Sequence, residues 1–417
     1  MRPRVTAIGT RGQARRRSTA LGVLFATTCA VLAGADLGAV APARAEYPEL
    51  NPPRAQPLPE DMVFPLAVAA TEVEIAVNYR TWSVRDEDGE SSVGQFAVPV
   101  YLRSRLHANL DFSYLFTAAS SSLDFDDGSD DLSGVTDGKL GVTYLLPDRR
   151  FSVGLGLRIP TGESELDPRE DAVAQVLNDR ILGFRVKRYG EGPDVEVRGG
   201  YATTLGAGTA VAGAVSYLVK GDFPILDPLS GAESTYEPGN EFSFVGELRS
   251  RAAARDWNGR LRIATYSRDR WDGEDEIKEA TEVELDLGVV EEHLTGLAVL
   301  DASFLFKGNT QILSSDGLSP VRDVGGNILR VGGGFYGQLD ARSELGGRAD
   351  LSLFGEGDNG TGDGLVFAIG PRYRRDLGGG FAAGLGYSFA MGSAEDGTID
   401  LTGHDLTATL GYGWGRR

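Results

Sequence analysis

Charged side chains occupy every second position in several segments of this 417-residue chain. In Val195-Glu196-Val197-Arg198, for example, the ionisable residues alternate with valines. Carboxylate and guanidinium groups at this spacing can pair with one another, or can select ions and polar solutes by charge. The residues with this potential are Glu196, Arg198, Glu247, Arg249, Arg260, Arg262, Glu282, Glu284, Asp286, Arg330 and Arg372.

The elements that must position these side chains are β-strands. Successive side chains of a strand point to opposite faces, so each alternating segment has one apolar and one polar face. About sixteen such segments, with fourteen as the lower count, lie between 73 and 414, and short turns alternate with longer acidic loops. The acidic loops are 121–134, 163–193, 221–240, 268–279, 308–326, 355–364 and 392–403.

This layout predicts an all-β fold: a transmembrane, antiparallel, up-and-down β-barrel over 71–417. The long acidic loops are then extracellular and the short turns periplasmic. A soluble sandwich or propeller also has short alternating strands, but its outward face is polar and its loops are not segregated by length.

The first 45 residues have the pattern of a secretory signal peptide, with a basic start, an apolar run and Ala43-Arg44-Ala45 before the cleavage point. A short transmembrane anchor is the alternative. Cys29 is the single cysteine and lies in this segment, so the exported chain would have no disulfide. Residues 46–70 are proline-rich, and we expect a periplasmic segment or a small plug of the lumen.

The charge balance limits the partners. With 41 Lys+Arg against 60 Asp+Glu, the chain has no basic patch of the kind that nucleic acid requires. Outer-membrane lipid, lipopolysaccharide and a small-molecule solute are the partners that a barrel in the outer membrane of a Gram-negative cell would meet. The sequence indicates no cofactor and leaves the oligomeric state open.

Signals of enzymatic or metal chemistry are sparse. The three histidines are scattered, and no nucleophile–base grouping is visible, so we expect no enzyme. The carboxylates of Asp124, Asp126, Asp127 and Asp130 form a weak Ca²⁺ candidate, because their spacing is not that of an EF-hand. Solvated surface charge is the other interpretation of this cluster.

Two further segments have special composition. Apolar residues recur at near-helical spacing between 169 and 186, which predicts a short amphipathic helix that folds over or into the pore, or lies exposed outside it. Gly332-Gly333-Gly334 lies within a strand segment, where glycines allow wall curvature or a close contact with a plug.

One stretch resembles a known family. It comprises a glycine–aspartate strand start, a hairpin and a returning strand that ends in Pro-Thr-Gly, with the motif residues Gly134, Asp137, Gly141, Pro160, Thr161 and Gly162. This pattern resembles outer-membrane transporters related to the long-chain fatty-acid channel and to the barrels linked with phenol degradation. The resemblance implies passive uptake of small hydrophobic or aromatic compounds, in some members through a lateral opening of the wall.

The sequence thus favours a passive outer-membrane channel for small solutes. A structural or surface-interaction barrel with an occluded lumen is the alternative. The charged residues form a selective constriction in the first case and a network of ion pairs that braces the wall in the second.

Overall fold

The computed structural model describes residues 71–414, apart from 88, 126–127, 207, 227–232, 253, 315–316, 323–326 and 356–362. The predicted signal peptide and the proline-rich segment at 46–70 lie outside the described residues. No helix in the described ranges is long and apolar enough to cross a membrane.

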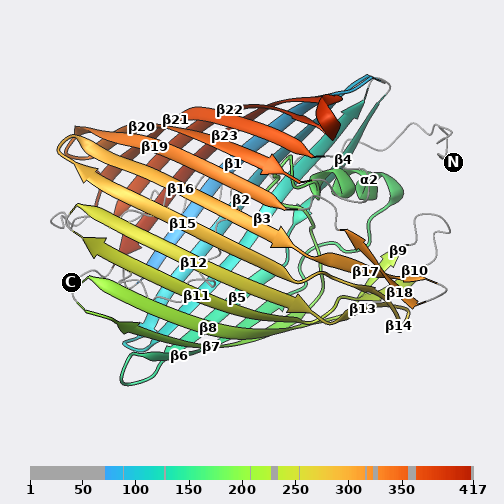
Figure 1. Cartoon of the computed structure of the whole chain (residues 1–417), viewed down its shortest axis with the longest axis horizontal. Coiled ribbons are helices and arrows are strands. Elements are labelled where there is room, and N and C mark those ends of the chain that lie inside the picture. The colour runs from blue at the N-terminus through green and yellow to red at the C-terminus, as the bar shows by residue number, and fades with distance from the viewer. Residues whose placement is uncertain are drawn as a thin grey trace. The chain divides into compact units, whose positions relative to one another are not determined.

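Sixteen antiparallel strands close into a barrel (Figure 1), which confirms the predicted fold. β4 and β5 both pair with β3 and together form one interrupted strand of the sixteen. The first strand closes the barrel against the last, with Thr71 opposite Trp414. The wall strands are β1 (Thr71–Arg85), β2 (Glu90–His107), β3 (Leu110–Phe125), β4 (Gly128–Val135), β5 (Gly138–Leu145), β6 (Phe151–Ile159), β7 (Asp194–Thr204), β8 (Thr209–Lys220), β11 (Glu241–Ala252), β12 (Arg255–Tyr266), β15 (Glu282–His293), β16 (Gly296–Lys307), β19 (Ile328–Asp340), β20 (Ser343–Phe354), β21 (Gly364–Gly378), β22 (Phe381–Ala394) and β23 (Ile399–Trp414).

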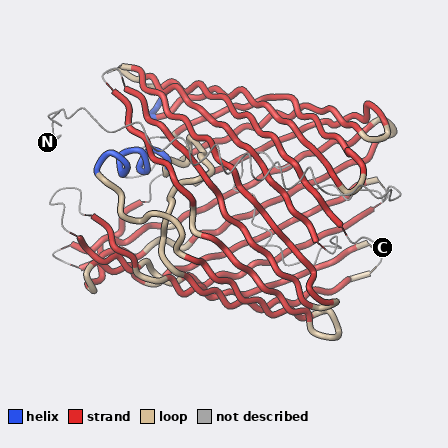
Figure 2. The backbone as a smooth tube through the Cα atoms, turned by 180° about the vertical axis from the view of Figure 1, so that it is seen from behind, coloured by secondary structure: helices blue, strands red, loops and turns tan. Residues whose placement is uncertain are grey.

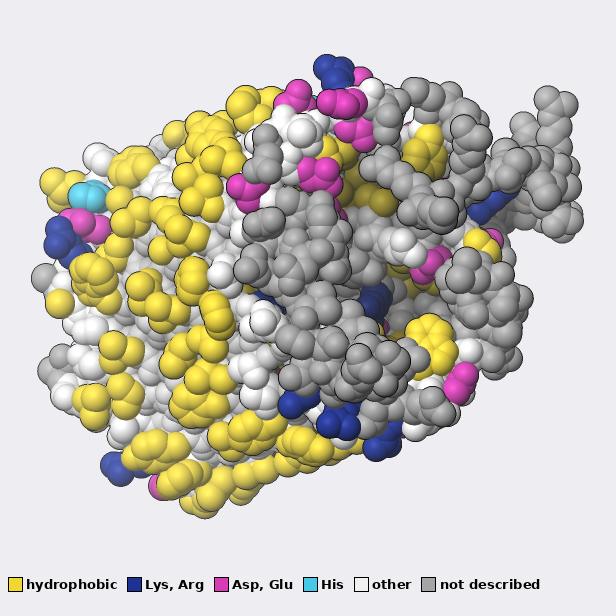
Figure 3. Space-filling model, turned by 45° about the vertical axis from the view of Figure 1, so that its right-hand side comes forward, with side chains coloured by type: hydrophobic (Ala, Val, Ile, Leu, Met, Phe, Trp, Pro, Cys, Tyr) yellow, Lys and Arg dark blue, Asp and Glu magenta, His cyan; other side chains and the backbone are white. Residues whose placement is uncertain are grey.

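The outward face of the wall is apolar. Val195 and Val197 are 43% and 54% exposed, whereas the side chains of Glu196 and Arg198, which alternate with them, are partly buried. The same alternation runs around the barrel, and Figure 3 shows hydrophobic side chains spread over the strands. An apolar surface of this extent is unfavourable in water and matches the lipid-facing band of a membrane-spanning barrel.

Three acidic loops differ from expectation, because each contains a β-hairpin. The hairpins are β9 (Phe223–Leu226) with β10 (Glu233–Glu237), β13 (Arg268–Trp271) with β14 (Glu274–Lys278), and β17 (Asn309–Ser314) with β18 (Gly317–Arg322). They pair side by side in a separate six-stranded sheet beyond the wall. The phenol of Tyr236 donates to Asp269 at 2.5 Å and thereby ties the first hairpin to the second.

Two other loops are shorter than expected. β3 continues to Phe125 and β4 begins at Gly128, so most of 121–134 belongs to strands. Likewise β22 reaches Ala394, a 3₁₀ turn (Glu395–Gly397) follows, and β23 begins at Ile399. Acidic and small residues in these segments concealed the strand pattern, because the backbone pairing that continues the wall does not depend on apolar side chains.

Candidate functional site: the lumen and its inserted loop

The connection between β6 and β7 carries the only α-helix among the described residues, α2 (Pro168–Leu177). Asp167 caps its start, since the carboxylate accepts from the backbone N–H groups of Arg169 and Glu170 at 2.8 and 3.0 Å. The helix ends nine residues before the predicted limit at 186. Gly183 has a φ of +60°, a left-handed conformation that does not continue a right-handed helix.

The apolar side chains of this loop pack against the inner face of the wall. Val173 and Leu177 are 0% exposed, and Figure 2 shows α2 and its flanking loop at the end of the barrel opposite the C-terminus. The loop therefore lies in the outer part of the lumen, on the sector formed by β1–β4 and β19–β23. The cluster contains Val173, Ala174, Leu177, Ile181, Leu182, Phe184, Val186 and Tyr189 from the loop and Trp82, Val93, Ala97, Ala119, Leu123, Leu132, Ile328, Phe354, Val366, Ala390, Ala394 and Leu401 from the wall.

Hydrogen bonds from the wall fix the loop in register. The amide of Gln95 donates to the carbonyl of Val186 at 2.7 Å and accepts from its N–H at 2.9 Å. The indole of Trp82 donates to the carbonyl of Leu182 at 2.8 Å, and Tyr189 and Ser121 share a hydrogen bond of 3.1 Å. These buried bonds satisfy polar groups that the apolar cluster would otherwise leave unpaired.

The family-like motif forms the base of this loop. The buried carboxylate of Asp137 accepts from the backbone N–H of Gly162 at 2.8 Å and of Glu191 at 2.7 Å, so it joins the two ends of the loop. The hydroxyl of Thr161 accepts from the N–H of Gly138 at 3.0 Å and donates to the carbonyl of Thr136 at 2.9 Å. The resemblance assigned no role to these residues, which the structure brings together as one clamp.

Small residues in the motif make this contact possible. A Cβ at Gly162 would overlap the carbonyl oxygen of Tyr189, and one at Gly134 would lie 3.3 Å from the ring of Tyr189. A Cβ at Gly141 would overlap the hydroxyl of Ser113 on the neighbouring strand. Pro160 directly follows the last residue of β6, where it cannot extend the ladder.

The wall strands outside the covered sector bring charged residues together. The register places Arg260 opposite Glu247 on one side and Asp286 on the other, and Arg262 opposite Glu284. Arg262 lies 2.5 Å from Glu241 and Arg260 lies 3.9 Å from Glu247. Each of these residues alternates with lipid-facing side chains such as Leu261 and Leu285.

Glu282 is the centre of this network. Its carboxylate lies 3.4 Å from Lys307 and 3.7 Å from Arg262, and it accepts from the phenol of Tyr266 at 3.2 Å. It also lies 3.3 Å from Arg180 of the inserted loop. The ion pair with Arg180 links the loop to the charged side of the lumen.

The remaining candidate residues also lie on the inward face. Arg249 follows the exposed Leu248 on β11, and Arg330 lies between the exposed Leu329 and Val331 on β19. Arg372 on β21 lies opposite Gly386 of β22, and its side chain is next to the position that a Cβ at Gly386 would take. Arg249 is thus on a strand of the ladder, two residues from Glu247, whereas Arg330 and Arg372 lie on β19 and β21.

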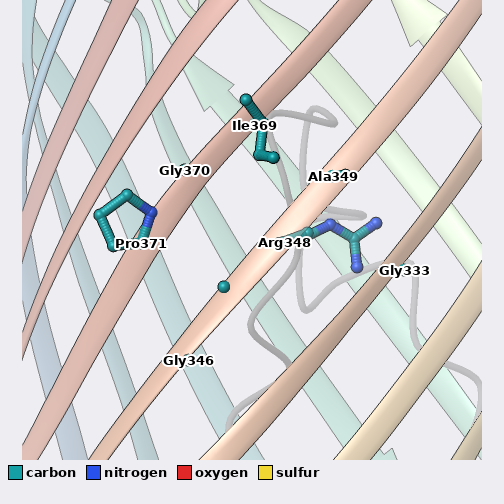
Figure 4. Close-up of a pocket in the computed structure, with 8 residues that line it drawn as sticks. Gly333, Gly346, Arg348, Ala349, Ile369, Gly370 and Pro371 are labelled. Atoms are coloured by element: carbon teal, nitrogen blue, oxygen red, sulfur yellow. The ribbon is translucent and has the colours of Figure 1, made fainter.

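Glycines on β19–β21 accommodate a buried arginine. Arg348 is 4% exposed and lies 2.7 Å from both Asp301 and Asp350. A Cβ at Gly332 would overlap its guanidinium and the carboxylate of Asp350. Figure 4 shows Arg348 extending from its strand toward the strand of Gly333, beside a shallow groove lined by Gly346, Gly347, Gly370 and Pro371. The Gly332–Gly334 run thus serves contacts within the wall.

A chamber of about 230 Å³ opens along β5–β8, β11 and β12. Its ionisable lining consists of Lys139, Arg158, Asp194, Glu196, Arg198, Glu241 and Arg262. Arg158 is paired with Glu191 and with Asp194, the latter at 3.1 Å. The chamber therefore lies on the charged side of the lumen, and the pair of Arg158 with Glu191 joins it to the base of the inserted loop.

Burial alters the acidity of groups in the loop. It lowers the pKa of Lys187 to about 8, and the neighbouring cations Arg180 and Arg330 act in the same direction. Burial also raises the pKa of Tyr189 to about 12, against the hydrogen bond from Ser121. Lys187 is therefore a loop cation that can lose its charge near neutral pH.

The calcium candidate gains no support from the described residues. Asp124 accepts from the hydroxyl of Ser92 at 3.3 Å, and Asp130 lies 3.9 Å from Arg169. Asp126 and Asp127 lie outside the described residues. Within the ranges that the structure covers, no three His, Cys, Asp or Glu residues are grouped as metal ligands.

No family model and no curated protein matches the chain. Among solved structures, it is similar to an outer membrane channel from Pseudomonas putida F1, at 13% identity and a TM-score of 0.38, over 84% of this chain and 97% of that one. It is also similar to the P. putida toluene transporter TodX (8%, 0.42, 86% and 93%) and to the outer membrane channel DcaP of Acinetobacter baumannii (10%, 0.41, 84% and 99%). These three proteins are described as outer-membrane channels or transporters, and at such identities the likeness concerns the fold alone.

Proposed function

We propose that this protein is a passive channel for small solutes in the outer membrane of a Gram-negative cell. One observation carries the proposal: the apolar side chains of the inserted loop pack on the sector β1–β4 and β19–β23, and within the described residues a charged chamber lies along β5–β8. In a polar lining of this kind, protein groups can replace part of the hydration shell of a passing solute. Export by the predicted signal peptide and contact with membrane lipid and lipopolysaccharide belong to the same proposal.

The charged lining bears on the class of solute. The motif resemblance implies hydrophobic or aromatic compounds, whereas Glu247, Arg260, Arg262 and Glu284 on the inner face favour polar ones. We therefore assign the path along β5–β16 to polar solutes, with the ladder as its selective lining.

The alternative is a structural barrel with an occluded lumen. The ion pair between Arg180 and Glu282 favours it, because this contact joins the loop to β15, a wall strand outside the sector that the apolar cluster covers. A lumen closed by such pairs would brace the wall without transporting solutes.

Single-channel conductance in a planar bilayer separates the two functions. Refolded full-length protein should show steady ohmic current, and a variant without residues 46–70 tests whether that segment closes the path. Current only from the shortened chain would make 46–70 a plug. Silence from both chains would contradict the channel and favour the structural barrel.

A further inference from the structure

The chamber on β5–β8 contains two charged groups that the wall leaves available. The side chains of Glu196 and Arg198 form no ion pair and no hydrogen bond with any other described residue, whereas the charge of Lys139 acts on Glu191. Their charged neighbours are already engaged: Arg158 with Glu191 and Asp194, and Arg262 with Glu241. Half-buried charges without a partner in the wall are the groups that a solute would meet.

The strand register orders these groups along the lumen. Lys139 lies opposite Arg158, Glu196 opposite Gly156, and Arg198 opposite Gly154. Alternate residues on one face of a strand are about 7 Å apart. Along the wall, Glu196 is therefore about 7 Å from the level of Arg198 and about 7 Å from the level of Lys139. On β7 the neighbour of Glu196 in the Lys139 row is Asp194, so Arg198 is the inward cation next to Glu196 along this strand.

Glycines hold the two β7 side chains close to the wall. A Cβ at Gly156 would be 3.1 Å from the carboxylate of Glu196, and one at Gly154 would be 3.3 Å from Nε of Arg198. Both side chains thus lie over β6 and leave the chamber open in front of them. This is the arrangement of a preformed recessed site with a few oriented polar groups.

The rest of the lining is small or apolar. Ala214, Leu218 and Val245 line the chamber, and the hydroxyls of Ser216 and Ser243 bond to each other at 2.8 Å. A volume of about 230 Å³ corresponds to roughly eight water molecules. The chamber can therefore hold the small aliphatic body of a solute as well as its charged end.

We propose that this chamber binds a zwitterionic solute of the α-amino acid class, with its carboxylate at Arg198 and its ammonium at Glu196. The carboxylate and ammonium of such a solute are joined through one carbon. With a hydrogen bond of about 2.8 Å at each end, they span roughly the 7 Å between oppositely charged rows. The inference rests on the proposed function, because it names the class of solute that the channel takes.

Three compounds of one carbon skeleton test the assignment: leucine, 4-methylpentanoate, which lacks the ammonium, and 3-methylbutylamine, which lacks the carboxylate. Their dissociation constants for the refolded full-length protein are measured by calorimetry in detergent. Leucine should bind at least about tenfold more tightly than either analogue, because each analogue leaves one charged group of the site unmatched. Equal or tighter binding of 4-methylpentanoate, or no binding of leucine, would overturn the proposal.

Variants assign the roles within the site. Arg198→Met should weaken leucine binding by roughly tenfold. Glu196→Gln should remove the preference for leucine over 4-methylpentanoate, an exchange of specificity that simple unfolding cannot produce. Arg374→Met, which removes a wall cation outside the chamber, is the matched control and should leave leucine binding unchanged.

Binding and conductance are separate readouts. If the protein binds leucine with this specificity but carries no current, the proposed channel is wrong and the proposed binding site is supported. A protein that conducts but does not bind leucine would disprove the site and leave the channel. The heat-dependent electrophoretic shift of folded barrels verifies that each variant is folded before its affinity is compared.

Discussion

At the scale of single residues, the inserted loop places cations in the lumen at different depths of burial. Arg180 is held by Glu282, whereas Arg185 is exposed and donates to Asn78 at 3.0 Å. Lys187 is half-buried, and burial together with Arg180 and Arg330 lowers its pKa to about 8, while Asp179 opposes that shift. Lys187 is therefore the lumen cation whose charge ordinary buffers can remove.

The charge of Lys187 should set a pH dependence of ion selectivity. Because its pKa is lowered, the ammonium is present at pH 7 and largely neutral at pH 9, where an exposed lysine would still be charged. The ratio of chloride to potassium permeability should fall roughly twofold over this interval as the local positive potential is lost. Reversal potentials in a KCl gradient measure it.

Lys187→Met is the control for this pH dependence. It should show the lower chloride permeability already at pH 7 and little change up to pH 9. An equal change with pH in the variant would assign the effect to another titrating group.

At the scale of elements, the loop between β6 and β7 depends on a clamp at its base. Its two ends meet at Asp137, whose carboxylate accepts from Gly162 and Glu191. The N–H of Asp137 in turn donates to the carbonyl of Tyr189 at 3.1 Å. The clamp brings residues 162 and 191 together and so defines where the loop enters the lumen.

Asp137→Asn should loosen this loop without opening the wall. The amide has one acceptor oxygen in place of two, so a buried N–H loses its partner, at a cost of about 1–3 kcal/mol. Trypsin should then cut faster after the basic residues between 180 and 188, which are otherwise held against the wall. The digestion is followed by mass spectrometry on the folded protein.

Asp148→Asn serves as the matched control, because Asp148 accepts only from the N–H of Arg150 in an exposed turn. It should leave the rate of cleavage between 180 and 188 unchanged. Equal rates for Asp137→Asn and the unmodified chain would show that the apolar cluster alone holds the loop.

At the scale of the whole molecule, the barrel is organised by two surfaces of opposite polarity. Lipid-facing positions such as Leu300, Phe304 and Phe306 on β16 are exposed, while Asp301 and Ser303 between them face inward. Closure of β1 against β23 joins the first and last strands of the wall, so neither of them is left as a free edge. The apolar band then requires a membrane, because exposure of this surface to water is unfavourable and lipid chains supply the apolar contacts.

Leu300→Arg tests this assignment of the outer face. Leu300 is 57% exposed near the middle of β16, and a cation there should lower the free energy of unfolding by about 2–4 kcal/mol in lipid vesicles. Leu294→Arg, in the exposed turn after β15, should cost little. Urea titration of vesicle-inserted protein compares the two, and similar losses for both would place the membrane boundary elsewhere.

Much of the fold follows from the sequence because its determinants are local. The period of two assigns Val195 and Val197 to lipid and Glu196 and Arg198 to the interior without knowledge of any distant residue. The up-and-down order makes consecutive wall strands neighbours, so the meeting of Glu247, Arg260 and Asp286 on β11, β12 and β15 follows from the strand order. The hairpins beyond the wall were missed because their pairing rests on backbone hydrogen bonds, which acidic side chains do not reveal.

The path of the inserted loop was decided only by the tertiary structure. One signal was present in the sequence: inward positions of β2 and β3 carry Val93, Ala97, Ala119 and Leu123 where a water-filled lumen would favour polar residues. These apolar inward positions indicate that another segment covers them, but they do not identify that segment. The answer depends on contacts between distant segments, such as Trp82 and Leu182, which are 100 residues apart. Local periodicity does not encode them, because an apolar side chain is satisfied by any apolar partner that the closed barrel brings near it.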